Sequence, residues 1–429
     1  MNPGPDKYDL MVVGSGLAGL ASALFAARRG LSVSLCGTSG GTDLSSGLID
    51  LLGVHPQEQG RRLDDPWAGI RDLKRTHPDH PYAFLGQEEI RAALEEFRAF
   101  SDSRGHPFQG RMERNVLVPT PAGTLKSSFL VPQSVWPGVE ALERKAPTLI
   151  VDFHGLKGFS GAQVKEGLGR LWPGLETVRV PFPGKSGELY PLHLARCLAR
   201  PEVRRELADS LAGLIHKVDY IGFPAILGIN RPPEVMAHLE ELTQRRVFEI
   251  PTLPPGLPGL RLRAGFGAGL SSLGVKSYSG RLVLEARPLE GEGYQLQLGY
   301  DRPQETVQAR AVVLATGRFL GGGLIADRKG VREPLFGLRV SQPENRREWT
   351  AADFFNPRGH PLSRAGLRTD PDLRPLDETG RPARACLHAV GTILAGNDWI
   401  RRKCGGGVSI ATAYKAVNSL ARELKAAQP

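Results

Sequence analysis

The stretch from Tyr8 to Gly30 constrains the fold of this 429-residue chain more than any other. It reads YDLMVVGSGLAGLASALFAARRG: an apolar run, a glycine-rich turn and a helix-compatible segment that ends at a glycine. A further apolar run at 31–35 completes a strand, helix and parallel strand. In such a turn the first glycine permits the bend, the second admits a phosphate, and the third packs helix on strand. We therefore predict a Rossmann-like nucleotide or flavin site at Gly14, Ser15, Gly16, Leu17, Ala18 and Gly19.

The end of the second predicted strand lacks an acidic residue. About 20 residues after the first glycine, a carboxylate normally binds the ribose of an adenosine. Residues 34–38 read SLCGT, and the nearest carboxylate, Asp43, follows a pair of glycines. FMN has a phosphate for the helix and no adenosine to hold, so this absence favours FMN, with FAD as the alternative.

Two later segments are typical of flavoproteins. VVLATG, at 312–317, predicts a buried strand that returns to the first sheet and ends beside the cofactor at Ala315, Thr316 and Gly317. Near the C-terminus a short strand ends at Gly391, and Gly405, Gly406, Gly407 and Val408 then open a long helix. The N-terminus of that helix would direct its dipole at the flavin. Thr392 stands where many flavoproteins have the aspartate that holds the ribityl chain.

The order of these segments predicts an α/β protein with an interrupted first domain. We expect a Rossmann-like flavin-binding domain of the two-dinucleotide-binding type, interleaved with a middle α/β cap or substrate domain. The predicted boundaries are 1–144 for the first segment with a loop-rich extension, 145–271 for the middle domain, and 272–429 for the second flavin-binding segment with its C-terminal helix.

Composition narrows the class of protein. The net charge is +10, but lysine and arginine are spread out, so we expect no nucleic-acid partner. Four cysteines lie far apart without a CxxC pair, which predicts neither a zinc site nor an iron–sulfur cluster and favours a reducing compartment. The apolar stretch at 10–27 is better explained by the strand, turn and helix than by a membrane span.

Across nearly its whole length the sequence resembles the B subunit of the anaerobic glycerol-3-phosphate dehydrogenase. The resemblance rests on an ordered set of motifs that includes GSGLAGL, SSGLIDLLG, TPAGTLKSS, IPTLPPGLPGLRL, ATGRFLGGGL and CGGGV. It implies a cytoplasmic flavoprotein, proposed to carry FMN, on the inner face of the cell membrane. It also implies an FAD-bearing A subunit and an iron–sulfur C subunit that passes electrons to menaquinone in fumarate or nitrate respiration. The implied reaction oxidises sn-glycerol 3-phosphate, a small phosphorylated substrate, to dihydroxyacetone phosphate.

Catalytic residues are less clearly marked than the flavin segments. Arg318, Arg328 and Arg332 follow the ATG strand and are candidates to clamp a phosphate, with pairing to Asp327 or Glu333 as the alternative. His360 is a candidate general base, although a lone histidine in a proline-rich loop is more often structural. Lys126 is a candidate to bind an anion, with simple exposure to solvent as the alternative. Three residues of the SSG segment are candidate flavin contacts, with a plain Ser-Gly turn as the alternative: Ser45, Ser46 and Gly47.

Three other functions are compatible with the same pattern. A stand-alone FAD-dependent reductase or dehydrogenase of the fumarate-reductase type would need no sister subunits. An RNA-modifying flavoprotein is suggested only by the excess of basic over acidic residues. A scaffold that has lost its flavin is suggested only by the threonine at 392.

Overall fold

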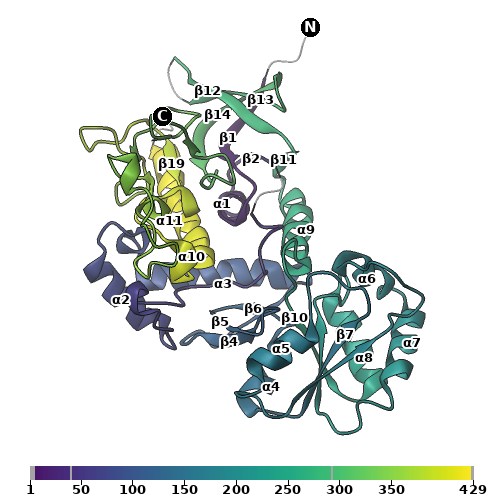
Figure 1. Cartoon of the computed structure of the whole chain (residues 1–429). Helices are drawn as coiled ribbons and strands as arrows, with labels where there is room; N and C mark the ends of the chain where they lie inside the picture. Colours follow the sequence, from purple (N-terminus) through teal and green to yellow (C-terminus); the bar gives the residue numbers. More distant parts are fainter. Residues whose placement is uncertain (1–4, 39–40, 291–292, 427–429) are drawn as a thin grey trace. The chain divides into compact units, whose positions relative to one another are not determined.

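The computed structural model describes residues 5–38, 41–290 and 293–426, and its contacts divide the chain into two compact units (Figure 1). The first unit contains Met1–Gly41, Asp50–Phe97 and Gly267–Pro429. The second contains Thr42–Ile49 and Arg98–Phe266. Each unit is built around its own sheet, so the prediction of an interleaved α/β architecture is confirmed.

The first unit is built on a mixed sheet with the strand order β11-β2-β1-β14-β13-β12, and β19 also pairs with β14. β1 runs parallel to β2, β14 runs parallel to β1 and β19, and β13 and β12 complete the sheet in antiparallel fashion. The strands are β1 (Asp6–Val13), β2 (Val33–Gly37), β11 (Lys276–Ser279), β12 (Leu282–Pro288), β13 (Tyr294–Gly299), β14 (Pro303–Leu314) and β19 (Leu387–Ala389).

Helices α1 (Leu17–Arg28) and α11 (Gly405–Ala426) pack against each other beside this sheet, as Figure 1 shows. The ring of Phe25 meets that of Tyr414 edge to face, with 5.2 Å between ring centroids. α1 is buried along nearly its whole length because its sequence is apolar or small on every side. The unit also contains α2 (Pro66–Thr76), most of α3 (Gln87–Ser103) and α10 (Trp399–Arg402).

Loop-rich connections between β14 and β19 form two short ribbons. β15 (Ile325–Ala326) pairs with β16 (Val331–Arg332), and β17 (Val340–Ser341) pairs with β18 (Gly366–Leu367). Short 3-10 helices lie between β17 and β18, namely η3 (Arg346–Glu348) and η4 (Pro361–Arg364), and η5 (Gly391–Ile393) follows β19.

The second unit contains a parallel four-stranded sheet in the order β10-β9-β7-β8. Three of its strands are almost continuously apolar, as expected where helices cover both faces of a parallel sheet. The strands are β7 (Thr148–Phe153), β8 (Leu175–Val180), β9 (Tyr220–Pro224) and β10 (Arg246–Ile250). The helices are α4 (Trp136–Arg144), α5 (Gly161–Leu168), α6 (Pro191–Cys197), α7 (Pro201–Leu211), α8 (Pro232–Thr243) and the first part of α9 (Leu257–Ser272).

The contacts place residues 98–144 in the second unit, whereas the sequence pattern suggested a boundary at 145. The reason lies in α4, which packs on β9 and β10. A Cβ on Gly138 of this helix would lie 2.4 Å from the ring of Phe248, so the helix approaches the sheet closely. Two small antiparallel ribbons belong to the same unit: β3 (Phe108–Gln109) with β6 (Val131–Pro132), and β4 (Val116–Pro119) with β5 (Leu125–Ser128).

Candidate flavin site

The glycine turn after β1 is shaped by close backbone contacts. Gly14 has φ +113°, and a Cβ there would lie 2.3 Å from the carbonyl oxygen of Ala315. A Cβ on Gly19 would lie 1.7 Å from the carbonyl oxygen of Gly14. Gly16 differs, because a Cβ there would meet nothing within 4 Å. The first and third glycines are therefore required by the fold, whereas the second faces open space, as a turn that admits a phosphate requires.

The first turn of α1 is prepared for an anion. Gly16 is the N-cap, so no side chain caps the helix, and the first turn contains no acidic residue. The first backbone N–H groups of a helix have no partner within the helix, and the helix dipole adds a partial positive charge there. This end of α1 can therefore bind a phosphate group.

The ATG segment at the end of β14 joins the same turn. The amide of Ala315 donates to the carbonyl oxygen of Val13, at 2.8 Å, which fixes the end of β14 beside the end of β1. The hydroxyl oxygen of Thr316 is buried and has no hydrogen-bond partner among the described residues. A Cβ on Gly317 would lie 3.6 Å from the hydroxyl oxygen of Thr392. An unsatisfied buried hydroxyl at this position is the kind of group that a polar ligand satisfies.

Gly391 links the C-terminal segment to α1. A Cβ on Gly391 would lie 2.7 Å from the Cβ of Ala18 and 3.6 Å from the hydroxyl oxygen of Ser409. The Gly391 amide donates to the hydroxyl of Thr412 in α11, at 2.9 Å. The structure thus brings together three of the predicted cofactor segments, which are the glycine turn, the ATG terminus and the C-terminal glycine segment.

The start of α11 rests on the segment that follows Ile49. The amide of Gly407 donates to the carbonyl oxygen of Asp50, at 2.7 Å, and the hydroxyl of Tyr82 donates to the carbonyl oxygen of Leu51, at 2.7 Å. A Cβ on Gly407 would lie 2.3 Å from that tyrosine oxygen, so only glycine fits there. Gly405 and Gly406 are partly exposed and Val408 is buried. Asp50 and Tyr82 were missed by the sequence analysis, because no spacing rule connects them with a helix more than 300 residues later.

A buried guanidinium lies just before α11 and was also missed. Arg402 is only 1% exposed. Its Nη1 donates to Nδ1 of His55, at 3.1 Å, and its Nη2 donates to Nε2 of His77, at 2.9 Å. Each accepting nitrogen must be unprotonated, and burial followed by the charge of Arg402 lowers the pKa of His77. The result is a buried cation whose guanidinium binds two imidazole nitrogens just before the start of α11.

Arg318, a predicted phosphate clamp, has structural partners instead. It donates to the backbone carbonyl oxygens of Thr392, Leu394 and Asn397, at 2.6, 3.0 and 2.7 Å, and to that of Ser363. Burial lowers the pKa of Arg318 to about 10. This guanidinium therefore ties loops together and has little capacity left for a substrate.

His360 and Arg332 are engaged in local contacts. Nδ1 of His360 accepts from the amide of Ala351, at 3.1 Å, so Nε2 carries the proton and donates to the carbonyl oxygen of Phe354, at 3.2 Å. Arg332 is exposed, with Nε 3.8 Å from a carboxylate oxygen of Asp327. Neither arrangement supplies a free base or clamp.

The SSG segment belongs to the second unit. The hydroxyl of Ser45 donates to the carbonyl oxygen of Thr42, at 2.8 Å, and Nζ of Lys126 donates to the hydroxyl oxygen of Ser46, at 3.5 Å. Gly47 has φ +70°, and a Cβ there would lie 2.5 Å from Cβ of Pro258. A role for Ser45, Ser46 and Gly47 at the flavin stays a prediction.

Within the part of the chain that the structure describes, no helix combines the length and apolar character needed to cross a bilayer. The cysteines Cys36, Cys197, Cys386 and Cys404 are all free thiols.

Comparison with known proteins identifies the relatives of this chain. The protein-family model described as an FAD binding domain matches residues 9–408. A probable B subunit of anaerobic glycerol-3-phosphate dehydrogenase from Halobacterium salinarum is 34% identical, over 97% of this chain and 99% of its own. The proteins named as the same B subunit in Vibrio cholerae and Pectobacterium carotovorum are 32% and 29% identical, over 96% and 97% of this chain and 96% and 99% of theirs.

Proposed function

Since this chain belongs to the FAD-binding family and to the B subunits of anaerobic glycerol-3-phosphate dehydrogenase, we propose that it is the flavin-containing B subunit of such an enzyme. The proposed enzyme oxidises sn-glycerol 3-phosphate to dihydroxyacetone phosphate. In the first unit the glycine turn contacts the ATG terminus through Gly14 and Ala315, and Gly391 contacts Ala18 of α1. This meeting of three segments, in a chain that matches these relatives over nearly its whole length, is the observation that carries the proposal.

We propose FAD as the cofactor. The sequence analysis preferred FMN because no carboxylate follows β2, but the family model is described as an FAD binding domain and lends FMN no support. A missing carboxylate removes one ribose contact and leaves the phosphate-binding turn unchanged, so it discriminates weakly between the two flavins. The start of α1 would hold the phosphate groups, and Thr316 and the start of α11 would contact the remainder of the cofactor.

The residues of this chain favour negative charge on the group they hold. When bound, a flavin would supply a redox centre that can take up electrons and pass them on one at a time. The start of α11 contributes the positive end of a helix dipole. The buried Arg402 adds a full positive charge nearby, and His55 and His77 fix its orientation. These groups would raise the affinity of the site for electrons.

We propose that this chain relays electrons and that the substrate reacts elsewhere in the complex. Arg318 and His360, the candidates for a phosphate clamp and a base, already bind backbone groups. The proposed sister subunits are an FAD-bearing A subunit and an iron–sulfur C subunit that delivers electrons to quinone. Membrane contact, at the inner face of the cell membrane, would come through these partners.

Two experiments test the identity of the cofactor and the need for sister subunits separately. The purified chain is denatured, and the released chromophore is identified by mass. FAD supports the proposed cofactor, FMN would restore the prediction from the missing carboxylate, and a colourless folded protein would contradict both. Oxidation of sn-glycerol 3-phosphate by a dye is then measured with this chain alone and with the A and C subunits. Activity that needs the sister subunits supports the proposal, whereas turnover by the chain alone would favour a self-sufficient dehydrogenase.

A further inference from the structure

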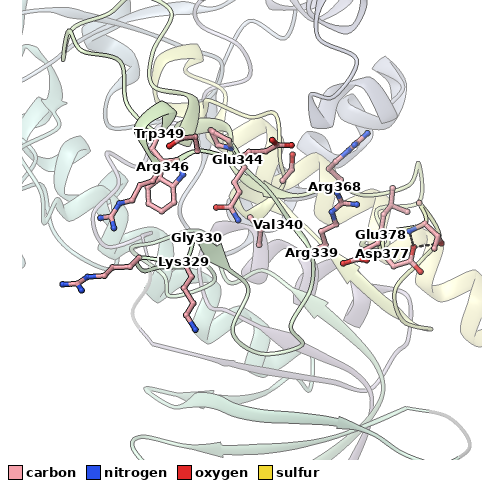
Figure 2. Close-up of a pocket in the computed structure, with 18 residues that line it drawn as sticks. Lys329, Gly330, Arg339, Val340, Glu344, Arg346, Trp349, Arg368, Asp377 and Glu378 are labelled. Atoms are coloured by element: carbon pink, nitrogen blue, oxygen red, sulfur yellow. Dashed lines mark hydrogen bonds between the residues drawn. The ribbon is translucent and has the colours of Figure 1, made fainter.

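A cavity of about 1010 Å³ lies in the first unit, within the loop-rich segment between β14 and β19 (Figure 2). Five exposed cationic residues line it, and we call them the cationic cup: Arg328, Lys329, Arg339, Arg346 and Arg368. In Figure 2, Lys329 and Arg346 lie on one side of Val340, and Arg339 and Arg368 lie on the other. The cup therefore presents positive charge from several separate loops.

The positive charges of the cup are only partly balanced by neighbouring carboxylates. None of the five cationic side chains forms an ion pair with another described residue, whereas many other arginines of the chain do. Three carboxylates, those of Glu344, Asp377 and Glu378, also line the cavity. One oxygen of Asp377 accepts from the amides of Thr379 and Arg381, at 2.8 and 3.0 Å, and the carboxylate keeps its negative charge. Five cationic residues still outnumber the three carboxylates. The surface is left with a positive excess that attracts an acidic ligand.

The walls of the cup are held in place by side-chain contacts. Oε1 of Gln342 accepts from the amide of Val331, and its Nε2 donates to the carbonyl oxygen of the same residue, both at 2.7 Å. The guanidinium of Arg346 lies 5.4 Å from the ring centroid of the nearly buried Trp349. These contacts hold the loops of the cup, so a ligand would have to order mainly the exposed cationic side chains.

Two exposed aromatic side chains lie in the loop that follows Trp349, which lines the cup. Phe354 and Phe355 are 74% and 84% exposed, and their rings meet edge to face with 5.1 Å between centroids. The two ends of their loop meet at Trp349, where the amide of Leu362 donates to the carbonyl oxygen of that residue, at 3.0 Å. Soluble proteins rarely leave two large rings together in water, and arginine and aromatic residues are enriched in protein interfaces.

We propose that the cationic cup and the Phe354–Phe355 pair are the docking face for a sister subunit that presents an acidic segment beside an apolar one. This inference rests on the proposed function, which supplies the sister subunits. A small anion fits the cup less well, because its cations are exposed, spread over several loops and mixed with carboxylates. Small-ligand sites are more enclosed and have few, convergent polar groups.

The experiment compares variants of the full chain in binding to the purified A and C subunits of the same dehydrogenase. R339E/R346E/R368E should weaken association about tenfold at low salt and flatten its salt dependence, because each reversal places like charges together. F354S/F355S should also weaken it about tenfold, through loss of apolar burial. Matched controls lie in the second unit, where Arg196, Arg200 and Arg205 are exposed and Leu171 is 55% exposed. R196E/R200E/R205E and Leu171→Ser should bind as the wild type does.

The outcomes separate the docking face from the proposed function. Flavin content and thermal unfolding of the variants are measured first, and unchanged values show that the variants are folded. Unchanged association of both cup and aromatic variants, or equal losses in the controls, would overturn the docking face and leave the proposed function standing. Titration with inorganic phosphate that saturates, and that R339E/R346E/R368E abolishes, would assign the cup to a small anion instead. Failure of the wild-type chain to bind either partner would overturn the proposed function and the docking face with it.

Discussion

Each unit has a connection from a central strand to a helix, and the N-termini of these two helices differ in how their backbone N–H groups are satisfied. In the first unit β1 leads into α1 through glycines, and no side chain caps the helix. In the second unit β7 leads into α5, where the hydroxyl oxygen of Ser160 accepts from the amide of Gln163, at 3.4 Å, and Asp152 accepts from the amide of Gly161, at 3.2 Å. The same architecture thus offers one helix end to a ligand and closes the other with its own side chains.

The second unit also pairs two of its buried carboxylates with arginines of the same unit. Asp152 is 2% exposed and receives Nε and Nη2 of Arg179, at 3.0 and 2.8 Å. Glu249 and Arg261 form a bidentate pair, with N···O distances of 2.6 and 2.8 Å. Burial raises the pKa of Glu249, but the charge and hydrogen bonds of Arg261 outweigh it and lower the pKa overall. These two pairs stabilise the second unit at Asp152 and Glu249. In the first unit the buried hydroxyl oxygen of Thr316 has no hydrogen-bond partner among the described residues.

The largest expected loss of stability comes from a substitution in the glycine turn before α1. Gly19→Val should destabilise the chain by at least about 4 kcal/mol, because the new Cβ would overlap the carbonyl oxygen of Gly14, at 1.7 Å. Flavin content should fall to the background. Chemical unfolding and flavin absorbance are the measurements. A stable variant that retains its flavin would show that the turn is looser than the contacts indicate.

Breaking the buried ion pair between Glu249 and Arg261 should destabilise the chain slightly less. Arg261→Met leaves Glu249 buried without its cation, and we expect a loss of about 3 kcal/mol in the free energy of unfolding. The double variant R261M/E249L removes both charges and should recover most of that loss. If the double variant is as unstable as the single one, charge does not dominate at this position, and the loss comes from packing and from the backbone groups of Leu227 and Gly228 that the pair binds.

A pH effect follows from His106 of the second unit. Burial, then the charge of Arg261, lowers the pKa of His106 to about 4. The unfolded chain has the ordinary histidine pKa of about 6.5, so it binds more protons than the folded chain between these values. Stability is therefore lost as pH falls from about 6.5 toward 4, by up to about 2 kcal/mol at pH 5, less any solvent screening of the partly exposed ring.

Unfolding at a series of pH values tests this effect. His106→Gln should have a flatter profile than the wild type between about pH 7 and pH 5, and at about pH 8 the two should differ only by a constant packing term. Parallel profiles would assign the acid sensitivity to other groups, among them His80, whose pKa burial and Arg402 also lower.

Removing the cap of α5 should have a smaller effect. Ser160→Ala deletes the hydroxyl that accepts from Gln163, and we expect a loss of about 1 kcal/mol in stability without loss of flavin. Ser160→Asp retains an acceptor and serves as the matched control. Loss of flavin in the alanine variant would contradict the assignment of this helix end to a purely structural role.

Short sequence patterns were enough to predict the core of the flavin-binding unit. The spacing of its glycines and the periodicity of its apolar residues can each be recognised within about 30 residues. The turn at Gly14–Gly19, the strand that ends at Ala315 and the glycine entry to α11 were found in this way. The partners of Arg318 and Arg402 were not, because they come from loops that only the folded chain brings near. The preference for FMN was weak for a related reason. The absence of a carboxylate after β2 does not show which other groups of the folded chain bind the ribose in its place.

A substitution of Gly16 should have the smallest effect on stability. It also tests most directly whether the N-terminus of α1, unlike that of α5, binds a ligand. A Cβ at this residue meets no atom within 4 Å, so Gly16→Val should change the free energy of unfolding of the flavin-free chain by less than about 1 kcal/mol. The added methyl groups would occupy the approach of the phosphate, so flavin content should fall at least about tenfold. Gly213→Val is the matched control, because a Cβ on Gly213 of the second unit also meets nothing within 4 Å, and flavin content should be unchanged there. If both valines leave the flavin in place, the open space beside Gly16 is not where the phosphate binds, and the difference between the two helix ends has another cause.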